Sequence, residues 1–490
     1  MGSAIKIIIV SGVCHFAAYY VLARLTPYGE KLRQYFILSV AIIAVAVILR
    51  SALLAYLATA FFCYNYTRGE DPSSRIALFF GLAFTLSMFE GFALNPGINL
   101  GGLSHPRMLS LCILLPIYFS SRPEPAMKKF HAIDWAVILF FIWSVMVDAR
   151  ASNVTSLART VLWTFFDYII PYIVIRRFMS NYGLAFTAIT FALLSQALVG
   201  ATEAILKWHV HTDIERVANF ADQLNPMYKF RYGLLRAQAS YLNPLIFALF
   251  ANMSFLCAVI FYLKPGLNVP KSYTKLMAYA AIGFSVLGTL SSGSRAGVAG
   301  SFLIVVVMLA AMWAIKRKSD PKKMLVSGFL AGLILVFSVG GDFIRENFDY
   351  RARLFDLGTQ VMMAEPIFGV TNPQHDPRLE SLKQGEGIVD IVNTYLLIGL
   401  KYGFPGLFLF MYAIFGGLNR LYFCMRRSSD EKLTIGLFAF ASLFVLAFNL
   451  ATTSAFGWSY LWIWLLLAVS SNIVARVAAE QKKERPLIGD

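Results

Sequence analysis

The sequence carries little charge and few cysteines for its length. Of 490 residues, 14% are charged, five are cysteine and six are histidine, whereas 58% are hydrophobic and 15% aromatic. This composition excludes a disordered chain and a single water-soluble enzyme. The cysteines fall inside apolar stretches without paired or metal-type spacing, so we interpret them as small core residues and predict no disulfide framework. What remains is an integral membrane protein.

Several motifs that carry enzymatic chemistry are also missing from the sequence. It has no Walker A sequence, no zinc-type cluster of histidine and cysteine, and no glycine-rich dinucleotide turn. No internal repeat is visible, and no matching pair of broken hydrophobic segments indicates an inverted-repeat transporter. We therefore expect no metal and no cofactor, so the substrate must supply the energy of any reaction.

Apolar runs long enough to cross a bilayer, about 20 residues each, recur from near Ile5 to about Val474. They predict an all-α polytopic membrane protein with about 14 transmembrane helices, in a range of about 12 to 15. The first run, in residues 1–24, lacks a small-residue cleavage site and predicts a span rather than a signal peptide. Arg50 interrupts the run from Phe36 to Phe62, which predicts either one long tilted helix or two short ones.

Basic residues gather in alternate loops, which the positive-inside rule assigns to the cytoplasm. These loops contain Arg176 and Arg177, residues 264–275, residues 316–323, residues 420–432 and the tail 476–485. The intervening loops are then outside, and the long ones are residues 207–240 and 341–391. The net charge of +16 therefore belongs to the inner face, which excludes nucleic acid as a partner. A bacterial inner-membrane protein that works at its periplasmic face fits this pattern.

The predicted organisation has five parts. They are the N-terminal transmembrane helices (1–206), a periplasmic loop (207–240), further transmembrane helices (241–340), a large periplasmic loop that carries short helices (341–401), and C-terminal transmembrane helices with a basic cytoplasmic tail (402–490).

Two arginines precede the mouth of one span. Arg231 and Arg236 stand five positions apart, shortly before Tyr241, Asn243 and Pro244. Guanidinium groups bind phosphate in a bidentate manner and stay charged beside lipid, so the pair is a candidate phosphate site. The alternative is interfacial anchoring by long basic side chains, and for Arg231 we favour this alternative.

A third arginine lies between two spans on the predicted outer side. Arg295 is surrounded by small residues in Ser291-Ser-Gly-Ser-Arg-Ala-Gly297. Small neighbours permit close helix packing, and they leave backbone N–H groups and the guanidinium free to approach an anion at the next helix N-terminus. A simple anchor needs no glycine and serine on both sides, so we favour a functional role for Arg295.

The large outer loop holds the remaining polar candidates. Arg353 lies near its start, and His375, Glu386 and Asp390 are candidate general bases. The alternative for His375 is a solvated loop side chain. If Asp390 starts a helix, Asn393 and Thr394 follow on its face at i+3 and i+4, toward the outer cavity.

Two further signals have plain structural explanations. Asp167 lies inside an apolar run, where an ionisable group is by default a functional hypothesis. We favour a structural pair with an arginine of another helix, for instance Arg50 or Arg159. His209 and His211 do not share a helical face, so a metal pair there is disfavoured.

The order of several short motifs resembles the O-antigen ligase and O-antigen polymerase superfamily. The motifs are Ser294-Arg-Ala-Gly297 before an apolar span, Arg353, the turn Glu365-Pro-Ile-Phe-Gly-Val370, Asn393-Thr-Tyr-Leu396, and Lys401-Tyr-Gly-Phe-Pro-Gly406. The likeness covers residues 231–423.

The resemblance implies a glycosyltransferase of the GT-C type that acts on a glycan linked to undecaprenyl pyrophosphate at the outer leaflet. It implies that Arg236, Arg295 and Arg353 hold the pyrophosphate. We add Arg231 as a further candidate pyrophosphate ligand and Asn393 and Tyr395 as candidate substrate-binding residues. Membrane lipids are partners, and a flippase and a chain-length regulator are further expected partners.

The sequence departs from the family at one position. Ligases of the family carry a histidine directly before the asparagine of the Asn-x-Tyr-Leu segment, where this chain has Val392. We therefore favour a polymerase of surface polysaccharide or exopolysaccharide over a ligase that transfers the glycan to lipid A core or protein. A lipid-linked glycan flippase, with a polar path through Asp167, Arg50 and Arg159, is the alternative of another class. A structural export component would need no arginines at the outer rim.

Overall fold

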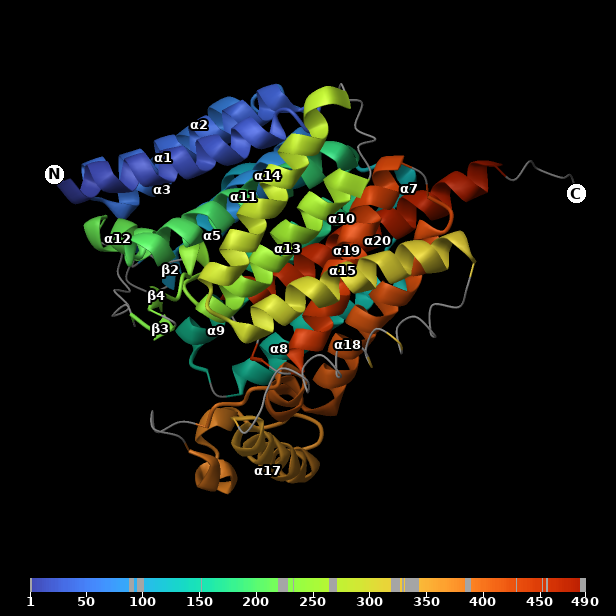
Figure 1. Ribbon diagram of the computed structural model, residues 1–490. Coiled ribbons are helices and arrows are strands. Elements are labelled where there is room, and N and C mark those ends of the chain that lie inside the picture. The colour runs from blue at the N-terminus through green and yellow to red at the C-terminus, as the bar shows by residue number, and fades with distance from the viewer. Residues whose placement is uncertain are drawn as a thin grey trace, which may run out of the picture.

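The computed structural model describes residues 2–87, 92–94, 101–150, 152–218, 228–231, 233–263, 271–318, 327, 330, 343–383, 389–428, 430–451, 453–454 and 457–484. These residues form a helical bundle with two small hairpins (Figure 1).

The first part of the chain contains the following elements: α1 (Gly2–Leu22), α2 (Gly29–Leu49), α3 (Ala52–Thr67), α4 (Pro72–Ala83), β1 (Phe92–Leu94), β2 (Gly101–Leu103), α5 (His105–Leu109), the π-helix η1 (Ser110–Leu114), α6 (Leu115–Ser120), α7 (Pro125–Lys128), α8 (Ala132–Ala149), α9 (Val154–Thr164), the π-helix η2 (Phe165–Ile169), α10 (Ile170–Phe178) and α11 (Tyr182–Leu206).

The second part continues with α12 (Val210–Val217), β3 (Phe230–Arg231), β4 (Leu234–Leu235), the 3-10 helix η3 (Ala239–Tyr241), α13 (Pro244–Leu263), α14 (Lys271–Ser291), α15 (Arg295–Lys316), α17 (Phe343–Ala364), the 3-10 helices η4 (Pro373–His375) and η5 (Pro377–Leu382), α18 (Thr394–Met425), α19 (Asp430–Leu450) and α20 (Gly457–Glu484).

Nine helices within the described ranges are long and apolar enough to cross a membrane. They are α1, α2, α7 with α8, α9 with η2 and α10, α11, α13, α18, α19 and α20, and shorter apolar helices occupy Lys275–Ser291 and Gly300–Lys316. The chain is therefore an all-α, multi-pass membrane protein, as the apolar runs predict.

The interrupted run around Arg50 forms two helices. Arg50 has φ 48°, in the left-handed region, and separates α2 from α3. Ser51 then caps α3, because its side chain accepts a hydrogen bond from the backbone N–H of Leu54 at 3.3 Å. The chain turns back at this point, and α3 packs against α2.

The central helices are enclosed and the outer helices expose apolar side chains. Helix α11 is buried along almost its whole length, and α1, α4, α13 and α14 pack around it. Peripheral side chains such as Phe61, Phe302 and Phe408 are exposed, as expected where helices face lipid.

The basic clusters gather at one end of the bundle. Arg426 donates a hydrogen bond to the carbonyl of Lys318 at 3.1 Å, and Lys432 forms an ion pair with Glu480. The helix ends that carry these groups are therefore adjacent. We call this the inner end, following the charge pattern, and the opposite end, with α12, both hairpins and α17, the outer end (Figure 1).

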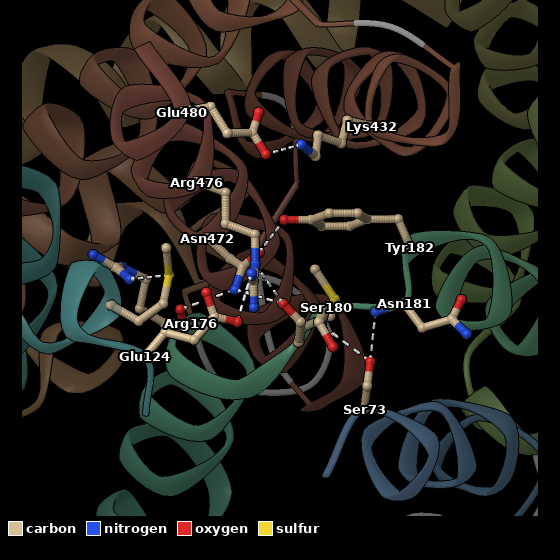
Figure 2. Close-up of polar contacts among 12 residues, drawn as sticks. Ser73, Glu124, Arg176, Ser180, Asn181, Tyr182, Lys432, Asn472, Arg476 and Glu480 are labelled. Carbon is tan, nitrogen blue, oxygen red and sulfur yellow. Dashed lines mark hydrogen bonds and ion pairs between the residues drawn. The ribbon is translucent and has the colours of Figure 1, made fainter. Parts of the chain in front are cut away.

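A buried polar network holds helices together at the inner end (Figure 2). The amide of Asn472 on α20 donates to the carbonyls of Ile175, Arg176 and Met179, the last two at 3.0 Å, and its oxygen accepts from the Tyr182 hydroxyl at 2.6 Å. Asn472 thus donates to carbonyls at the C-terminus of α10 and just beyond it, where the helix itself supplies few donors. This network is structural.

The large outer loop contains one long helix besides its short ones. Helix α17 has 22 residues, and η4 and η5 follow it. Helix α17 packs against α18 and η5 and lies beyond α8 and α18 at the bottom of Figure 1. The prediction of short helices is correct only for η4 and η5.

Candidate functional site

A hairpin at the outer end places two of the predicted arginines against the turn before α15. This turn, residues 291–294, is called the serine turn below. Arg231 Nη1 donates to the carbonyl of Gly293 at 2.8 Å, and Arg236 Nε donates to the carbonyl of Ser292 at 3.2 Å. The backbone N–H of Ala237 donates to the carbonyl of Ser291 at 2.9 Å. The structure thus brings Arg231 and Arg236 together beside Arg295, the first residue of α15.

Glycine is required at the centre of the serine turn. Gly293 has φ +59°, and a Cβ atom there would lie 3.1 Å from Cγ of Arg236 and 3.6 Å from Cβ of Arg231. The left-handed backbone and the close arginines both favour a residue without a side chain.

The serine hydroxyls then shape the start of α15. Ser294 caps the helix by accepting from the N–H of Gly297 at 3.1 Å, and Ser292 Oγ accepts from the N–H of Ser294 at 3.1 Å. A Cβ atom at Gly297 would lie 2.9 Å from Cβ of Ala248, so α15 packs closely on α13 here. The small residues noted in the sequence therefore have a structural role.

A buried carboxylate fixes the loop that leads out of the hairpin. Glu203, at the end of α11, accepts from the backbone N–H groups of Val210 at 2.9 Å and of Gln238 and Ala239 at 3.0 Å each. Its carboxylate also contacts His209 Nδ1 at 3.3 Å. Glu203 is fully buried, so these donors replace the water that the carboxylate lost.

The two arginines make the site strongly cationic. Burial and the neighbouring charge of Arg231 lower the pKa of Arg236. In the described part of the chain, neither arginine forms an ion pair with a carboxylate. The positive end of the α15 dipole adds to this potential. Such a site favours an anion, and phosphate oxygens fit guanidinium donors well.

The other predicted phosphate ligands are less defined. Arg295 begins α15, but its side chain lies outside the described residues. Arg353 lies on α17 with an exposed side chain. Of the four predicted arginines, Arg231 and Arg236 therefore both bind the serine turn, and the backbone of Arg295 follows that turn.

The candidate bases lie in the outer loop. His375 is exposed, and its Nδ1 contacts Oδ1 of Asn372 at 3.2 Å. Asp390 is exposed, and its carbonyl accepts from the Tyr350 hydroxyl at 2.9 Å. Partial burial lowers the pKa of Arg351, and the charge of Asp390 opposes this shift. Glu386 lies outside the described residues.

Helix α18 begins at Thr394, four residues after the start considered from the sequence. Asn393 is its N-cap and accepts from the N–H of Leu396 at 3.0 Å. The Tyr395 hydroxyl donates to the carbonyl of Ala447 at 2.9 Å. These contacts give Asn393 and Tyr395 structural roles, joining α18 to its cap and to α19.

Two of the motifs behind the family resemblance interlock. The N–H of Val370 donates to the carbonyl of Leu400 at 2.7 Å, and the N–H of Phe404 donates to the carbonyl of Pro366 at 2.8 Å. We call the turn 365–370, seated against residues 401–406, the latch. It joins α17 to the kink of α18 at Gly403 and Pro405.

Both glycines of the latch have positive φ. Gly369 has φ +63°, and a Cβ atom there would lie 2.3 Å from the carbonyl oxygen of Leu400. Gly403 has φ +66°, and its Cβ atom would lie 2.1 Å from the carbonyl oxygen of Ile367. Only glycine permits this close approach of two backbones.

Side chains of α8 and of its C-cap residue hold the latch in place, and no pattern in the sequence points to them. Trp143 Nε1 donates to the carbonyl of Tyr402 at 2.8 Å, and its ring stacks on Phe368 with centroids 5.5 Å apart. Arg150 Nη2 donates to the carbonyl of Phe368 at 2.6 Å.

An ion pair beside the latch was also missed. Asp148 Oδ1 lies 3.1 Å from Lys401 Nζ, which donates to the Tyr402 hydroxyl at 3.0 Å. Both charges stand at the ends of apolar runs, and the sequence pattern does not fix which of these ends lie side by side. A carboxylate and a lysine at predicted outer helix ends are nevertheless a usable signal for such a pair.

Asp167 forms the structural pair that the sequence favours, with an arginine that the sequence analysis did not consider. Arg107 Nε donates to Asp167 Oδ1 at 3.0 Å, and Arg107 Nη2 donates to Oδ2 at 2.9 Å. The Arg107 guanidinium also lies 4.3 Å from the centre of the Trp163 ring. The π-helix η2 holds Asp167, and η1 follows Arg107.

His209 and His211, the two histidines of the outer loop 207–240, lie in different surroundings. His209 contacts Glu203, whereas His211 is buried on α12. Burial lowers the pKa of His211 to about 4. In the ranges that the structure describes, no group of three or more His, Cys, Asp or Glu side chains is arranged to hold a metal ion.

Part of the chain matches a known family. Residues 280–411 match the family model described as O-antigen ligase. No curated protein matches the chain. The matched segment contains the serine turn from Ser291 on, α15, α17, the latch and the start of α18. The match over this segment supports the resemblance to the O-antigen ligase and O-antigen polymerase superfamily that the sequence motifs indicate, in a chain that is a multi-pass membrane protein.

Proposed function

We propose that the protein joins undecaprenyl-pyrophosphate-linked saccharide repeat units into a surface polysaccharide or exopolysaccharide at the periplasmic face of the bacterial inner membrane. One observation carries this proposal. Arg231 and Arg236 are both fixed on the serine turn, directly before Arg295 and at the start of the segment that matches the O-antigen ligase family.

The arginines fit the chemistry of the leaving group. When a sugar leaves its pyrophosphate carrier, negative charge develops on phosphate oxygens. Fixed guanidinium groups in a water-poor site stabilise such charge by several kcal/mol. We assign this role to Arg231, Arg236 and Arg295, with Arg353 as a further ligand from α17. Because these groups supply the positive charge, the proposed reaction requires no metal.

The acceptor hydroxyl must lose a proton as it attacks. A positioned base contributes typically about 10²- to 10⁴-fold to such a reaction. We propose that the base is His375, Asp390 or Glu386, with Asn393 and Tyr395 supporting the substrate-facing end of α18. Attack opposite the leaving diphosphate inverts the anomeric centre, and we assign the chain to the GT-C type.

We favour polymerisation over ligation because of Val392. A ligase for lipid A core or protein would share the donor and the arginines and differ only in acceptor. A flippase and a chain-length regulator are the partners expected for a polymerase of this kind. The flippase function itself is less well supported, because Arg107 and the Trp163 ring already surround Asp167 on the polar path that it would need.

The test is Arg295→Ala in cells whose surface glycan is sized on a gel. We expect the glycan length or amount to collapse while the protein stays at wild-type abundance. Arg216→Ala is the matched control, because Arg216 is an exposed arginine on the same side, paired with Asp213 at 3.0 Å. Surface pairs of this kind contribute about 0–1 kcal/mol. Unaltered glycan in Arg295→Ala would remove Arg295 from the mechanism.

A second measurement separates enzyme from transporter. Purified protein that elongates undecaprenyl-pyrophosphate oligosaccharide without added metal or nucleotide would exclude a transport function. Variants at His375 and Asp390, assayed in the same way, identify the base by the loss of turnover with donor binding retained.

A further inference from the structure

Helix α17 has an apolar stripe that the described residues leave exposed. Leu354 and Val361 on one face are buried against α18 and η5. On another face Phe355 is 58% exposed and Met363 is 66% exposed. At about 100° per residue, Ala352 and Thr359 fall in the same sector as these two side chains. We call these four residues the α17 stripe.

The side of α17 next to this stripe is polar. Asp349, Arg353, Asp356 and Gln360 are all exposed, and by the same helical spacing they lie together, about 120° around the helix from the face of Leu354 and Val361 and directly beside the stripe. The helix therefore presents three surfaces: one to the protein, one apolar and one polar. A helix that lies at a membrane surface has these last two surfaces side by side.

The α17 stripe continues into the lipid-facing surface of the bundle. Beyond the end of α17, Ile367 is 56% exposed and Phe368 is 45% exposed. The latch seats this turn against Gly403, and Phe404 and Phe408 follow on α18 with exposures of 37% and 66%. Exposed apolar side chains, with the exposed Glu365 among them, thus lead from Met363 to the membrane-spanning part of α18.

The length of α18 indicates where this run of apolar side chains lies relative to the bilayer. From Phe404 to Met425 the helix rises about 33 Å, at about 1.5 Å per residue, which is close to the thickness of the hydrocarbon core, about 30 Å. The outer boundary of the hydrocarbon therefore lies near the kink, at the level of Ile367. The end of α17 that carries Met363 is next to this boundary.

We propose that α17 is an interfacial helix whose stripe rests in the outer leaflet of the bilayer while its polar side faces water. Lipid thus covers the α17 stripe, at the boundary between acyl chains and headgroups. This placement does not depend on the proposed reaction.

The test compares two nitroxide labels on α17 of the full-length protein in nanodiscs of phosphatidylethanolamine and phosphatidylglycerol. Met363→Cys puts the label on the stripe, and Gln360→Cys puts it on the polar side, one turn away. Labelled wild-type protein measures the background from the five native cysteines. Collision rates with oxygen, which dissolves in lipid, and with a water-soluble nickel complex are measured by power saturation.

We expect the label at 363 to collide mainly with oxygen and the label at 360 mainly with nickel. Phe355→Cys repeats the measurement at a second stripe position, so that a local disturbance at 363 does not decide the result. High nickel accessibility at both stripe positions would overturn the proposal, because the stripe would then lie in water. Low accessibility to both reagents would also overturn it, because protein would then cover the stripe.

Discussion

Gly403→Ala should separate the latch from the kink of α18. Gly403 has φ 66° and ψ −173°, a region that is essentially restricted to glycine and costs other residues about 1–3 kcal/mol. The new Cβ atom would also lie 2.1 Å from the carbonyl oxygen of Ile367, which is backbone and cannot rotate away. The turn must therefore move.

Movement of the turn removes both backbone hydrogen bonds of the latch, from Val370 to Leu400 and from Phe404 to Pro366. Each contributes about 0.5–1.5 kcal/mol. Together with the backbone strain, the expected loss is about 2–6 kcal/mol, a large part of the stability of a typical domain, about 5–15 kcal/mol. We expect a lower unfolding temperature in detergent and faster proteolysis of residues 365–400.

Gly416→Ala in the same helix is the matched control. Its new Cβ atom would approach only Tyr412 Cε1, at 3.9 Å, and glycine in a helix interior costs about 0.5–1 kcal/mol relative to alanine. This variant should therefore be as stable as wild type or slightly more so. If Gly403→Ala unfolds at the same temperature as Gly416→Ala, the latch does not fix α17.

Three further variants test other parts of the outer end. Gly293→Ala should lower the free energy of unfolding by about 1–2 kcal/mol because of its left-handed backbone, and it should lower glycan synthesis by displacing Arg236. The control Gly283→Ala, with no atom within 4 Å of its new Cβ, should have neither effect. Equal glycan synthesis in the two variants would contradict the role of the serine turn. Glu203→Gln should lower stability by about 1–3 kcal/mol in thermal unfolding, because the amide N–H₂ group would face a backbone donor; an unchanged unfolding temperature would show that these donors find other partners. Burial raises the pKa of Glu215 well above its usual range, so the folded protein retains a proton that the unfolded chain releases, and this contribution to stability is lost as the pH rises above about 4.3 toward the raised value. Glu215→Gln should therefore gain more stability over wild type at pH 8.5 than at pH 5, and an equal shift at both would refute this assignment.

The sequence predicts what depends on composition and short-range pattern. Long apolar runs predict the multi-pass helical fold, and the small residues around Gly293 predict close packing at the start of α15. The serine turn and the paired arginines were also visible, because Arg231 and Arg236 are near each other in the chain.

Contacts between distant residues were not predictable in the same way. The close approach of Gly369 and Leu400 joins two motifs that, in the sequence, only mark a turn and a kink. Asp148 and Lys401 end separate apolar runs, and their pairing depends on how α8 packs against α18. For Arg107 and Asp167, the π-helices η1 and η2 shift the helical phase, so a pattern with 3.6 residues per turn does not show that the two side chains meet.

The central claim is that the arginines on the serine turn stabilise a departing diphosphate. The most direct measurement is the release of undecaprenyl pyrophosphate from an undecaprenyl-pyrophosphate oligosaccharide by purified protein in the presence of a metal chelator. Wild type and Arg216→Ala should release it at similar rates. The double variant Arg231→Ala and Arg236→Ala should be slower by at least about 10²- to 10³-fold, the usual cost of removing a single fixed donor of this kind. A double variant that releases undecaprenyl pyrophosphate at the wild-type rate would contradict the account.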